Sequence, residues 1–278
     1  MLIENTVLEH WIDNFYGYGS WSAKFWFVAY EEGGGDLPEE VAEKLGYFYK
    51  AHPRKTASLC DIRELYKHVT VRLDGPRASS FKTLYEYRFG NNAIQHNVWK
   101  NLIAFEHAYL NEKLPDLPAY QRATFASPQA HREALIRLYP LPSPHNHAWY
   151  YSWLDLPTMG FLKSRALYQE HLFKRRLDEI LSNIVTHKPD VVLMYGMENI
   201  TALKASVQTF FHDIKFKMIK ATAPNATAGQ IPQHHRVDVE GTTILVTTQI
   251  PALRHNRIET GFDWEAFAKK ARADTPSI

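Results

Sequence analysis

The sequence predicts an α/β fold of three layers, in which helices cover both faces of a largely parallel central sheet. Apolar, β-rich runs alternate with stretches of helical periodicity, and this alternation is typical of strands joined by crossover helices. Residues 24–30 (KFWFVAY) are apolar at almost every position, as expected for a strand buried on both faces. Because we find no internal repeat and no linker, residues 1–278 are predicted to form one domain.

The first part of the chain is predicted to form a helix, a strand, a glycine-rich loop and a second helix. Residues 3–16 place apolar side chains at helical spacing, and the strand at 24–30 follows them. The loop at 31–36 (EEGGGD) leads into a helix over 37–52, which Asp36 can cap and whose first turn carries acids.

The middle of the chain has weaker patterns. Short helices are predicted at 61–66 and 97–110, and we interpret the region of about 51–125 as an inserted helical segment that shapes a pocket. A strand over 133–139 (EALIRLY) is expected to end at the rigid proline-rich stretch that follows it. A long helix is predicted over 163–187.

The last part of the chain continues the alternation of strands and helices. We predict strands at 189–196, 215–221 and 242–248, helices at 197–211 and 262–273, and a polar loop with histidines before the last strand. In open sheets of this class, ligands bind at the carboxyl ends of the strands. The unusual segments that follow predicted strands are 31–36, 140–149 and 249–256.

Composition excludes several classes of protein. With 45% hydrophobic and 22% charged residues, the chain has the composition of a folded protein. A net charge of +2 does not by itself indicate a nucleic-acid partner. Cys60 is the only cysteine, which excludes intrachain disulfides and cysteine-ligated zinc or iron–sulfur clusters. The N-terminus lacks a signal-peptide pattern, and no apolar run approaches the ~20 residues needed to span a bilayer. We expect a cytoplasmic protein without membrane partner, metal cluster or cofactor.

The segment 31–36 is the sharpest local feature. Adjacent carboxylates at a strand end, Glu31 and Glu32, can supply a general base or stabilise a developing cation. The glycines after them allow the backbone to approach a ligand closely. The alternative is a solvated turn whose acids begin the next helix. The spacing fits neither the dinucleotide-binding fingerprint nor a phosphate-binding P-loop.

Two further segments contain residues suited to nucleic acids. Arg254, His255, Asn256 and Arg257 can contact phosphates or a base edge, although an ordinary exposed polar loop is slightly favoured from the sequence alone. Residues 140–153 place His145, Asn146 and His147 beside Trp149, Tyr150, Tyr151 and Trp153, most of which we interpret as core residues. Metal binding at His145 with His147, or at His234 with His235, is not favoured because further ligands are missing.

The order of these segments on an α/β chain resembles the uracil-DNA glycosylase superfamily. Its first motif follows a buried strand, and the matching stretch here runs from Ala29 to Gly33. Glu31 stands where the family has the Asp or Asn that activates or positions water, and Glu32 replaces the usual proline. Gly33 stands where uracil-specific members have a bulky tyrosine, so the resemblance implies a wider pocket, as in the mismatch-specific and thymine-type branches.

The other motifs of the family have degenerate counterparts. In the base-reading stretch, Arg137 stands where the family has an asparagine, and its guanidinium offers donors only. Ile250-Pro251-Ala252 matches the last motif without its histidine, a role that Gln249 or His255 can take over. The Arg254 and Asn256 pair and Trp264-Glu265 resemble the ending of the single-strand-selective branch.

The resemblance implies a monomeric DNA glycosylase that flips a nucleotide out of DNA and hydrolyses its N-glycosidic bond. Glu31, or else Glu32, would stabilise the sugar cation and orient water, and Arg137, Gln249 or His255 would stabilise the leaving base. Tyr30, Gly33, Gly34, Arg137, Tyr139 and Gln249 are the expected base pocket, and Arg254, Asn256 and Arg257 the expected DNA contacts.

The wide pocket and the arginine favour a 5-substituted pyrimidine, such as the hydroxymethylated or glucosylated cytosine of phage DNA, and hence a role in antiviral defence. Three alternatives stay open at this point. They are a uracil or mismatch repair glycosylase, a nucleoside hydrolase, and a non-catalytic DNA-binding module of the same fold.

Overall fold

The computed structural model describes residues 3–35, 37–73, 78–144, 149–154, 156–222, 230–252 and 262–274. It confirms the α/β fold. One mixed sheet has the strand order β3-β1-β4-β2-β5-β8-β7-β6. The strands are β1 (Phe15–Tyr18), β2 (Phe25–Gly33), β3 (Ser58–Cys60), β4 (Glu133–Ser143), β5 (Val191–Tyr195), β6 (Lys217–Ile219), β7 (His234–Val239) and β8 (Thr242–Val246).

The centre of the sheet is parallel, as the sequence predicted. β2 pairs in parallel with β4 on one side and with β5 on the other, and β5 pairs in parallel with β8. Antiparallel pairing is confined to β1 with β4 and to the β6, β7 and β8 edge. The carboxyl ends of β2, β4 and β5 therefore meet at one edge of the sheet.

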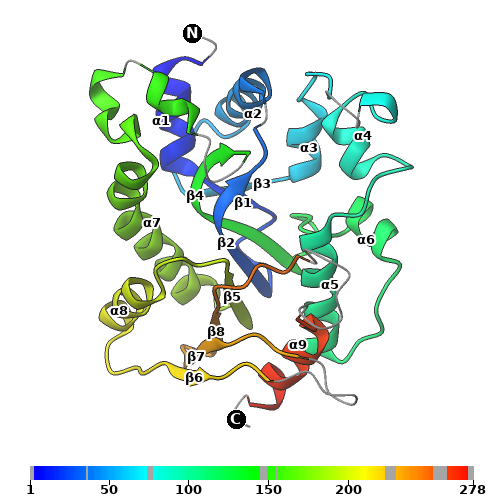
Figure 1. The fold of residues 1–278 in the computed structure, drawn as a ribbon, viewed down its shortest axis with the longest axis vertical. Coiled ribbons are helices and arrows are strands. Elements are labelled where there is room, and N and C mark those ends of the chain that lie inside the picture. Colours follow the sequence, from blue (N-terminus) through cyan, green and yellow to red (C-terminus); the bar gives the residue numbers. More distant parts are fainter. Residues whose placement is uncertain are drawn as a thin grey trace.

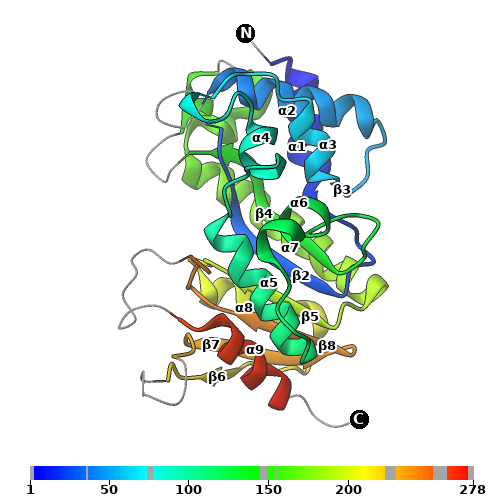
Figure 2. The same cartoon turned by 90° about the vertical axis from the view of Figure 1, so that its right-hand side faces the viewer.

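Helices form the outer layers. α1, α7 and α8 lie on one side of the sheet, and α5 and α9 on the other, with α5 and α9 in front of the sheet in the second view (Figures 1 and 2). On the second side, Phe105 of α5 packs edge to face on Phe27 of β2 and on Phe267 of α9. The helices are α1 (Asn5–Asn14), α2 (Pro38–Ala51), α3 (Ile62–Lys67), α4 (Leu84–Phe89), α5 (Asn97–Leu110), α6 (Leu117–Ala123), α7 (Arg165–His187), α8 (Ile200–Phe211) and α9 (Trp264–Ala273), with 3₁₀ turns at Tyr150–Trp153 and Pro157–Lys163.

A buried arginine on α7 holds the first layer against β4. The guanidinium of Arg176 donates to the carbonyls of Leu138 at 2.7 Å, Ile12 at 3.0 Å, and both Phe15 and Arg137 at 2.9 Å. A fully buried cation is costly unless its donors are satisfied, and here backbone oxygens from α1, β1 and β4 satisfy them. This contact fixes the backbone of β4 at the point where it carries Arg137.

One predicted strand limit and one predicted helix limit were wrong. The strand predicted at 133–139 continues through Pro140 and Pro142 to Ser143. Proline lacks the N–H that a ladder needs, but β1 pairs only with Leu135 and Ile136, so β4 has no β1 neighbour where the prolines lie. The first helix also ends at Asn14, two residues before its predicted limit, and the chain turns directly into β1.

The polar stretch with histidines before the last strand is not a loop but the strand β7. It forms a hairpin with β8, and both residues of its turn, Glu240 and Gly241, have positive φ. Such a turn is typical of tight hairpins. The dipeptide Glu240-Gly241 was therefore a sequence signal for a hairpin, and the polar side chains of β7 obscured it. β3 was likewise not predicted, because it is three residues long.

Within the described ranges, no helix combines the length and the apolar character that a membrane crossing requires. Asp36, the predicted cap of α2, lies outside those ranges.

Candidate active site

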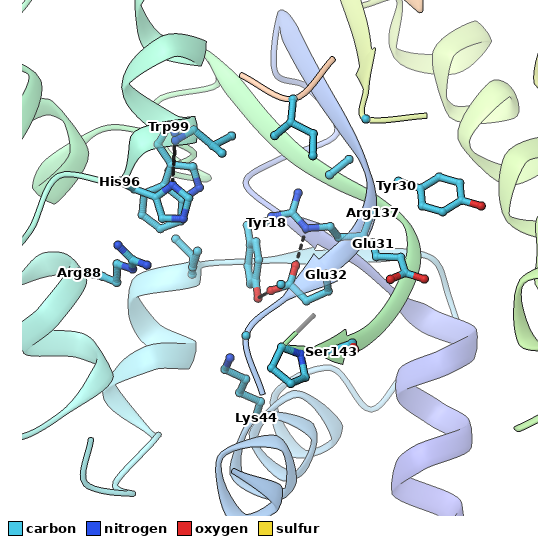
Figure 3. A pocket seen from close by; sticks show the side chains of 18 of the residues that line it. Tyr18, Tyr30, Glu31, Glu32, Lys44, Arg88, His96, Trp99, Arg137 and Ser143 are labelled. Atoms are coloured by element: carbon cyan, nitrogen blue, oxygen red, sulfur yellow. Dashed lines mark hydrogen bonds and ion pairs between the residues drawn. The ribbon is translucent and has the colours of Figure 1, made fainter. Parts of the chain in front are cut away.

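A cavity of about 420 Å³ opens at the carboxyl edge of the parallel strands. Figure 3 shows it with the end of β2 crossing its middle. Its walls combine the strand-end segment with α2 and with residues of 62–99, which belong to the segment of about 51–125 that the sequence analysis interpreted as shaping a pocket. The described lining residues are Tyr18, Ala29, Tyr30, Glu31, Glu32, Gly33, Gly34, Glu40, Lys44, Ile62, Tyr66, Leu73, Leu84, Arg88, His96, Val98, Trp99, Arg137, Ser143, Pro144, Tyr195, Gly196, Glu198 and Ile250.

The two adjacent glutamates point in different directions because successive side chains of an extended strand alternate. Glu32 is buried, accepts a hydrogen bond of 2.8 Å from the Tyr18 hydroxyl, and forms an ion pair with Arg137. Both oxygens of Glu32 are thus engaged. This arrangement leaves Glu32 as part of a fixed pair and not as a free base.

Arg137 lines the cavity, as expected, but it does not stand alone there. Its Nε donates to Glu32 and its Nη1 donates to the Ile136 carbonyl at 3.2 Å. Burial alone would lower the pKa of Arg137, but the Glu32 carboxylate outweighs burial and raises that pKa above its usual range. The guanidinium therefore stays charged, with its charge largely balanced before any ligand arrives.

Glu31 lies on the α7 side of β2 and is held by two donors. Arg165 forms an ion pair with its Oε2, and the Gln169 amide donates to Oε1 at 2.7 Å. The same Arg165 donates to the Ser143 hydroxyl at 2.6 Å, which ties the ends of β2 and β4 together. Burial raises the pKa of Glu31, an effect that Arg165 and Gln169 reduce and Glu198 adds to. A carboxylate with a raised pKa is a better proton acceptor than an ordinary one.

The residues next to the glutamates differ in their access to the cavity. Tyr30 lines it, and burial raises the pKa of its hydroxyl to about 12. Tyr139 lies behind Tyr30, edge to face at 5.0 Å, and is not in the wall. At Gly33 a Cβ atom would meet nothing within 4 Å, so the cavity is open there. Gly34 has a φ of +93°, a conformation that favours glycine.

A buried ion pair on α2, which the sequence analysis did not single out, forms another part of the wall. Lys44 is 1% exposed, donates to Glu40 at 2.5 Å, and lies 5.1 Å from the centre of the Tyr66 ring. Burial would lower the pKa of Lys44, but Tyr66 and Glu40 raise it above its usual range. The spacing of four residues between Glu40 and Lys44 was the only signal in the sequence, and it is common on solvated helices.

His96, which was also missed, has a fixed protonation state. Its Nδ1 accepts from the backbone amides of Val98 at 3.2 Å and Trp99 at 3.4 Å, which caps α5. Burial, together with Arg88 and Arg137, lowers the pKa of His96 to about 3. A neutral imidazole whose Nδ1 accepts carries its proton on Nε2. His96 is therefore a neutral donor in the cavity wall.

The last loop begins beside the cavity. Ile250 is in its wall, and the next carbonyl, that of Pro251, accepts from Asn101 of α5 at 2.8 Å. The Gln249 side chain instead bonds Thr248 at 3.3 Å, outside the wall. The predicted residues Arg254, His255, Asn256 and Arg257 lie outside the described ranges.

Residues 149–153 of the aromatic segment, and the pair His234 and His235, are not among the described residues of the cavity wall. Tyr151 and Trp149 pack inward, as interpreted, whereas Tyr150 and Trp153 are 39% and 80% exposed and are not core residues. His145, Asn146 and His147 lie outside the described ranges, and the described residues hold no group of three His, Cys, Asp or Glu placed for a metal ion.

Comparison with known proteins adds no family to this geometry. The sequence matches no protein-family model, and no curated protein matches it. The chemistry of the cavity therefore rests on its residues: two restrained carboxylates, balanced cations, a neutral donor and several aromatic rings.

Proposed function

We propose that this protein is a DNA glycosylase that flips a substituted pyrimidine out of DNA and hydrolyses its N-glycosidic bond, leaving an abasic site. The observation that carries the proposal is the position of Glu31, a carboxylate with a raised pKa, at the rim of a cavity of about 420 Å³. A cavity of this size lies within the range of ligand sites. It is also bordered by Gly33, where the wall is open.

In the proposed reaction, the sugar gains positive charge as the bond to the base breaks, and the base leaves with negative charge. Glu31, held by Arg165 and Gln169, stabilises the first charge and accepts a proton from the attacking water. Arg137 stabilises the second charge. Because its pair with Glu32 is preformed, little reorganisation accompanies the reaction.

The loop that starts at Ile250 and Pro251 supplies the proposed DNA contacts. Arg254 fills the gap left by the flipped nucleotide, and Asn256 and Arg257 contact the strand, with His255 as a further donor to the base. The start of this loop in the cavity wall supports this assignment. We further propose a cytoplasmic monomer that acts in defence against phages whose DNA carries modified cytosine.

The test compares duplex and single-stranded oligonucleotides that contain uracil, 5-hydroxymethylcytosine or glucosylated 5-hydroxymethylcytosine, with abasic sites scored by alkaline cleavage. We expect cleavage at a substituted base and a loss of about 10²–10³ in its rate after Glu31→Gln. Efficient cutting of uracil alone would overturn the modified-base assignment in favour of repair. Turnover of free nucleosides without DNA cleavage would support a nucleoside hydrolase, and salt-dependent binding that yields no abasic sites would support a non-catalytic module.

A further inference from the structure

The wall of the cavity formed by residues 62–99 has no role in the proposed reaction. In Figure 3, Tyr30 and Glu31 lie on one side of the cavity, and Arg88, His96 and Trp99 lie on the other. The Glu32–Arg137 pair stands between them. The space beside the second group, which we call the far compartment, is bordered by α2, α3, α4 and the start of α5.

The balance of charge in the wall argues against a phosphate or another fully charged anion in the far compartment. Among the described lining residues, the carboxylates outnumber the cationic side chains by four to three: Glu31, Glu32, Glu40 and Glu198 against Lys44, Arg88 and Arg137. Lys44 and Arg137 are already paired with Glu40 and Glu32. A phosphate would have to compete for these partners, so a neutral group fits the far compartment better.

The hydrogen-bonding groups of the far compartment suit hydroxyls. His96 presents a donor at Nε2, for which no acceptor occurs in the described parts of the chain. The pair of Lys44 and Glu40 adds donor and acceptor capacity side by side, as a hydroxyl group requires. Tyr66 and Trp99 supply flat apolar surface next to these groups. Alternating hydroxyls and C–H faces are the chemistry of a sugar.

We propose that the far compartment binds a hexose attached to the 5-position of the pyrimidine, with His96 as the specificity-determining donor. This inference rests on the proposed function, because it names the substituent on the base that Glu31 releases. The preformed geometry supports selectivity: the His96 ring stacks on Trp99 at 4.5 Å, and its backbone amide donates to Gln121 at 2.8 Å. A site built to bond a hydroxyl discriminates against an analogue without it, because its polar groups are then left unpaired.

The experiment measures kcat/KM for two substrates in the same duplex, glucosylated 5-hydroxymethylcytosine and 5-hydroxymethylcytosine itself. The variant is His96→Asn, which retains a good helix cap at α5 and removes the Nε2 donor. Asp116→Asn, a similar change at the cap of α6 away from the cavity, serves as the control. Thermal unfolding of each variant confirms that the fold is kept.

We expect the wild type to prefer the glucosylated base, and His96→Asn to reduce the ratio of the two kcat/KM values by about tenfold, as for the loss of one hydrogen bond. Asp116→Asn should leave the ratio as in the wild type. A wild type that prefers the unglycosylated base, or a ratio that His96→Asn does not change, would refute hexose binding in the far compartment. Neither result would contradict the proposed glycosylase activity. Absence of abasic sites with every substrate would instead refute the proposed function.

Discussion

Two clusters of buried acids lie at opposite ends of β4, and they differ in how the negative charge of the buried carboxyls is compensated. At the carboxyl end, each glutamate has its own arginine: Glu32 pairs with Arg137, and Glu31 with Arg165. At the amino end, Glu133 and Glu106 are both almost fully buried.

The amino-end cluster has too few cations for its acids. Arg132 donates to Glu106 at 2.9 Å, and the Tyr120 hydroxyl donates to Glu133 at 2.6 Å. The remaining oxygen of each carboxyl has no hydrogen-bond partner among the residues that the structure describes. Burial and the neighbouring Glu133 carboxylate raise the pKa of Glu106 far above its ordinary value, and Arg132 offsets only part of this. These surroundings favour a protonated Glu106 carboxyl.

The difference between the two clusters distinguishes a candidate active site from a cluster of buried acids with a structural role. Both clusters contain buried acids with unusual surroundings, and perturbed pKa values alone would nominate either. Of the two, the carboxyl-end cluster lines the cavity of about 420 Å³ and pairs each of its glutamates with an arginine. The amino-end cluster neutralises itself with a proton, and Arg132 also reaches Glu112 at the surface.

The largest expected effect is a difference in stability: removing the arginine should lower the free energy of unfolding more at the carboxyl-end cluster than at the amino-end cluster. Arg137→Met should destabilise the fold by about 3–5 kcal/mol, because Glu32 is left charged and buried. Arg132→Met should cost clearly less, since the Arg132 side chain is 32% exposed and Glu106 can hold a proton. Urea unfolding measures both. The double change Glu32→Gln with Arg137→Met should recover part of the loss, and equal costs at the two ends would contradict the comparison.

Replacing one glutamate by glutamine in each cluster should affect base excision in the carboxyl-end cluster and not in the amino-end cluster. Glu31→Gln is expected to reduce base excision by about 10²–10³ through the loss of charge at the reacting sugar. Glu106→Gln, at the opposite end of β4, should leave excision within about twofold, as an ordinary structural change away from the cavity. Single-turnover assays measure both rates. Similar losses in the two variants would mean that the effect of Glu31→Gln is structural.

The pH dependence of stability should report the amino-end cluster. Glu106 retains a proton in the folded protein that the unfolded chain, with an ordinary pKa of 4.5, has released near neutral pH. Its contribution is therefore present in full at acid pH and declines as the pH rises, by up to about 1.4 kcal/mol per pH unit. Glu106→Gln should flatten this slope in urea unfolding between about pH 6 and pH 8. An unchanged slope would place the titrating group elsewhere.

The smallest effect should arise at the open wall of the carboxyl-end cluster. A tyrosine at Gly33 has room, and it should narrow the cavity and reduce excision of substituted bases by about tenfold or less without affecting the fold. Gly160→Tyr, where a Cβ also meets nothing within 4 Å, is the matched control. Excision that Gly33→Tyr does not alter would show that substrates do not pass Gly33.

Much of the fold followed from local pattern. The apolar runs at 24–30, 189–196 and 242–248 correspond to β2, β5 and β8, and the helical periodicity at 97–110 matches α5 residue for residue. The edge strand β3 was missed because it is only three residues long, and β7, which lies between β8 and β6, was missed because its polar side chains hide the strand pattern.

Only some residues of the candidate active site could be predicted from the sequence. The pair Glu31 and Glu32 could be found because a strand, two acids and three glycines are consecutive in the sequence. Lys44 and His96 could not, because a lysine on a helix and a lone histidine in a weakly patterned region resemble ordinary surface residues. Their burial at the cavity is a consequence of how α2 and α5 pack.

By itself the sequence determined the parallel core and the position of two acids at the end of its central strand. The tertiary structure decided which cation each acid meets. Arg137 is 105 residues from Glu32, and Arg165 is 134 residues from Glu31. Hydrophobic periodicity is a local property, whereas the charge state of a buried carboxyl depends on the partners that crossover connections bring to it, and desolvation makes those partners decisive.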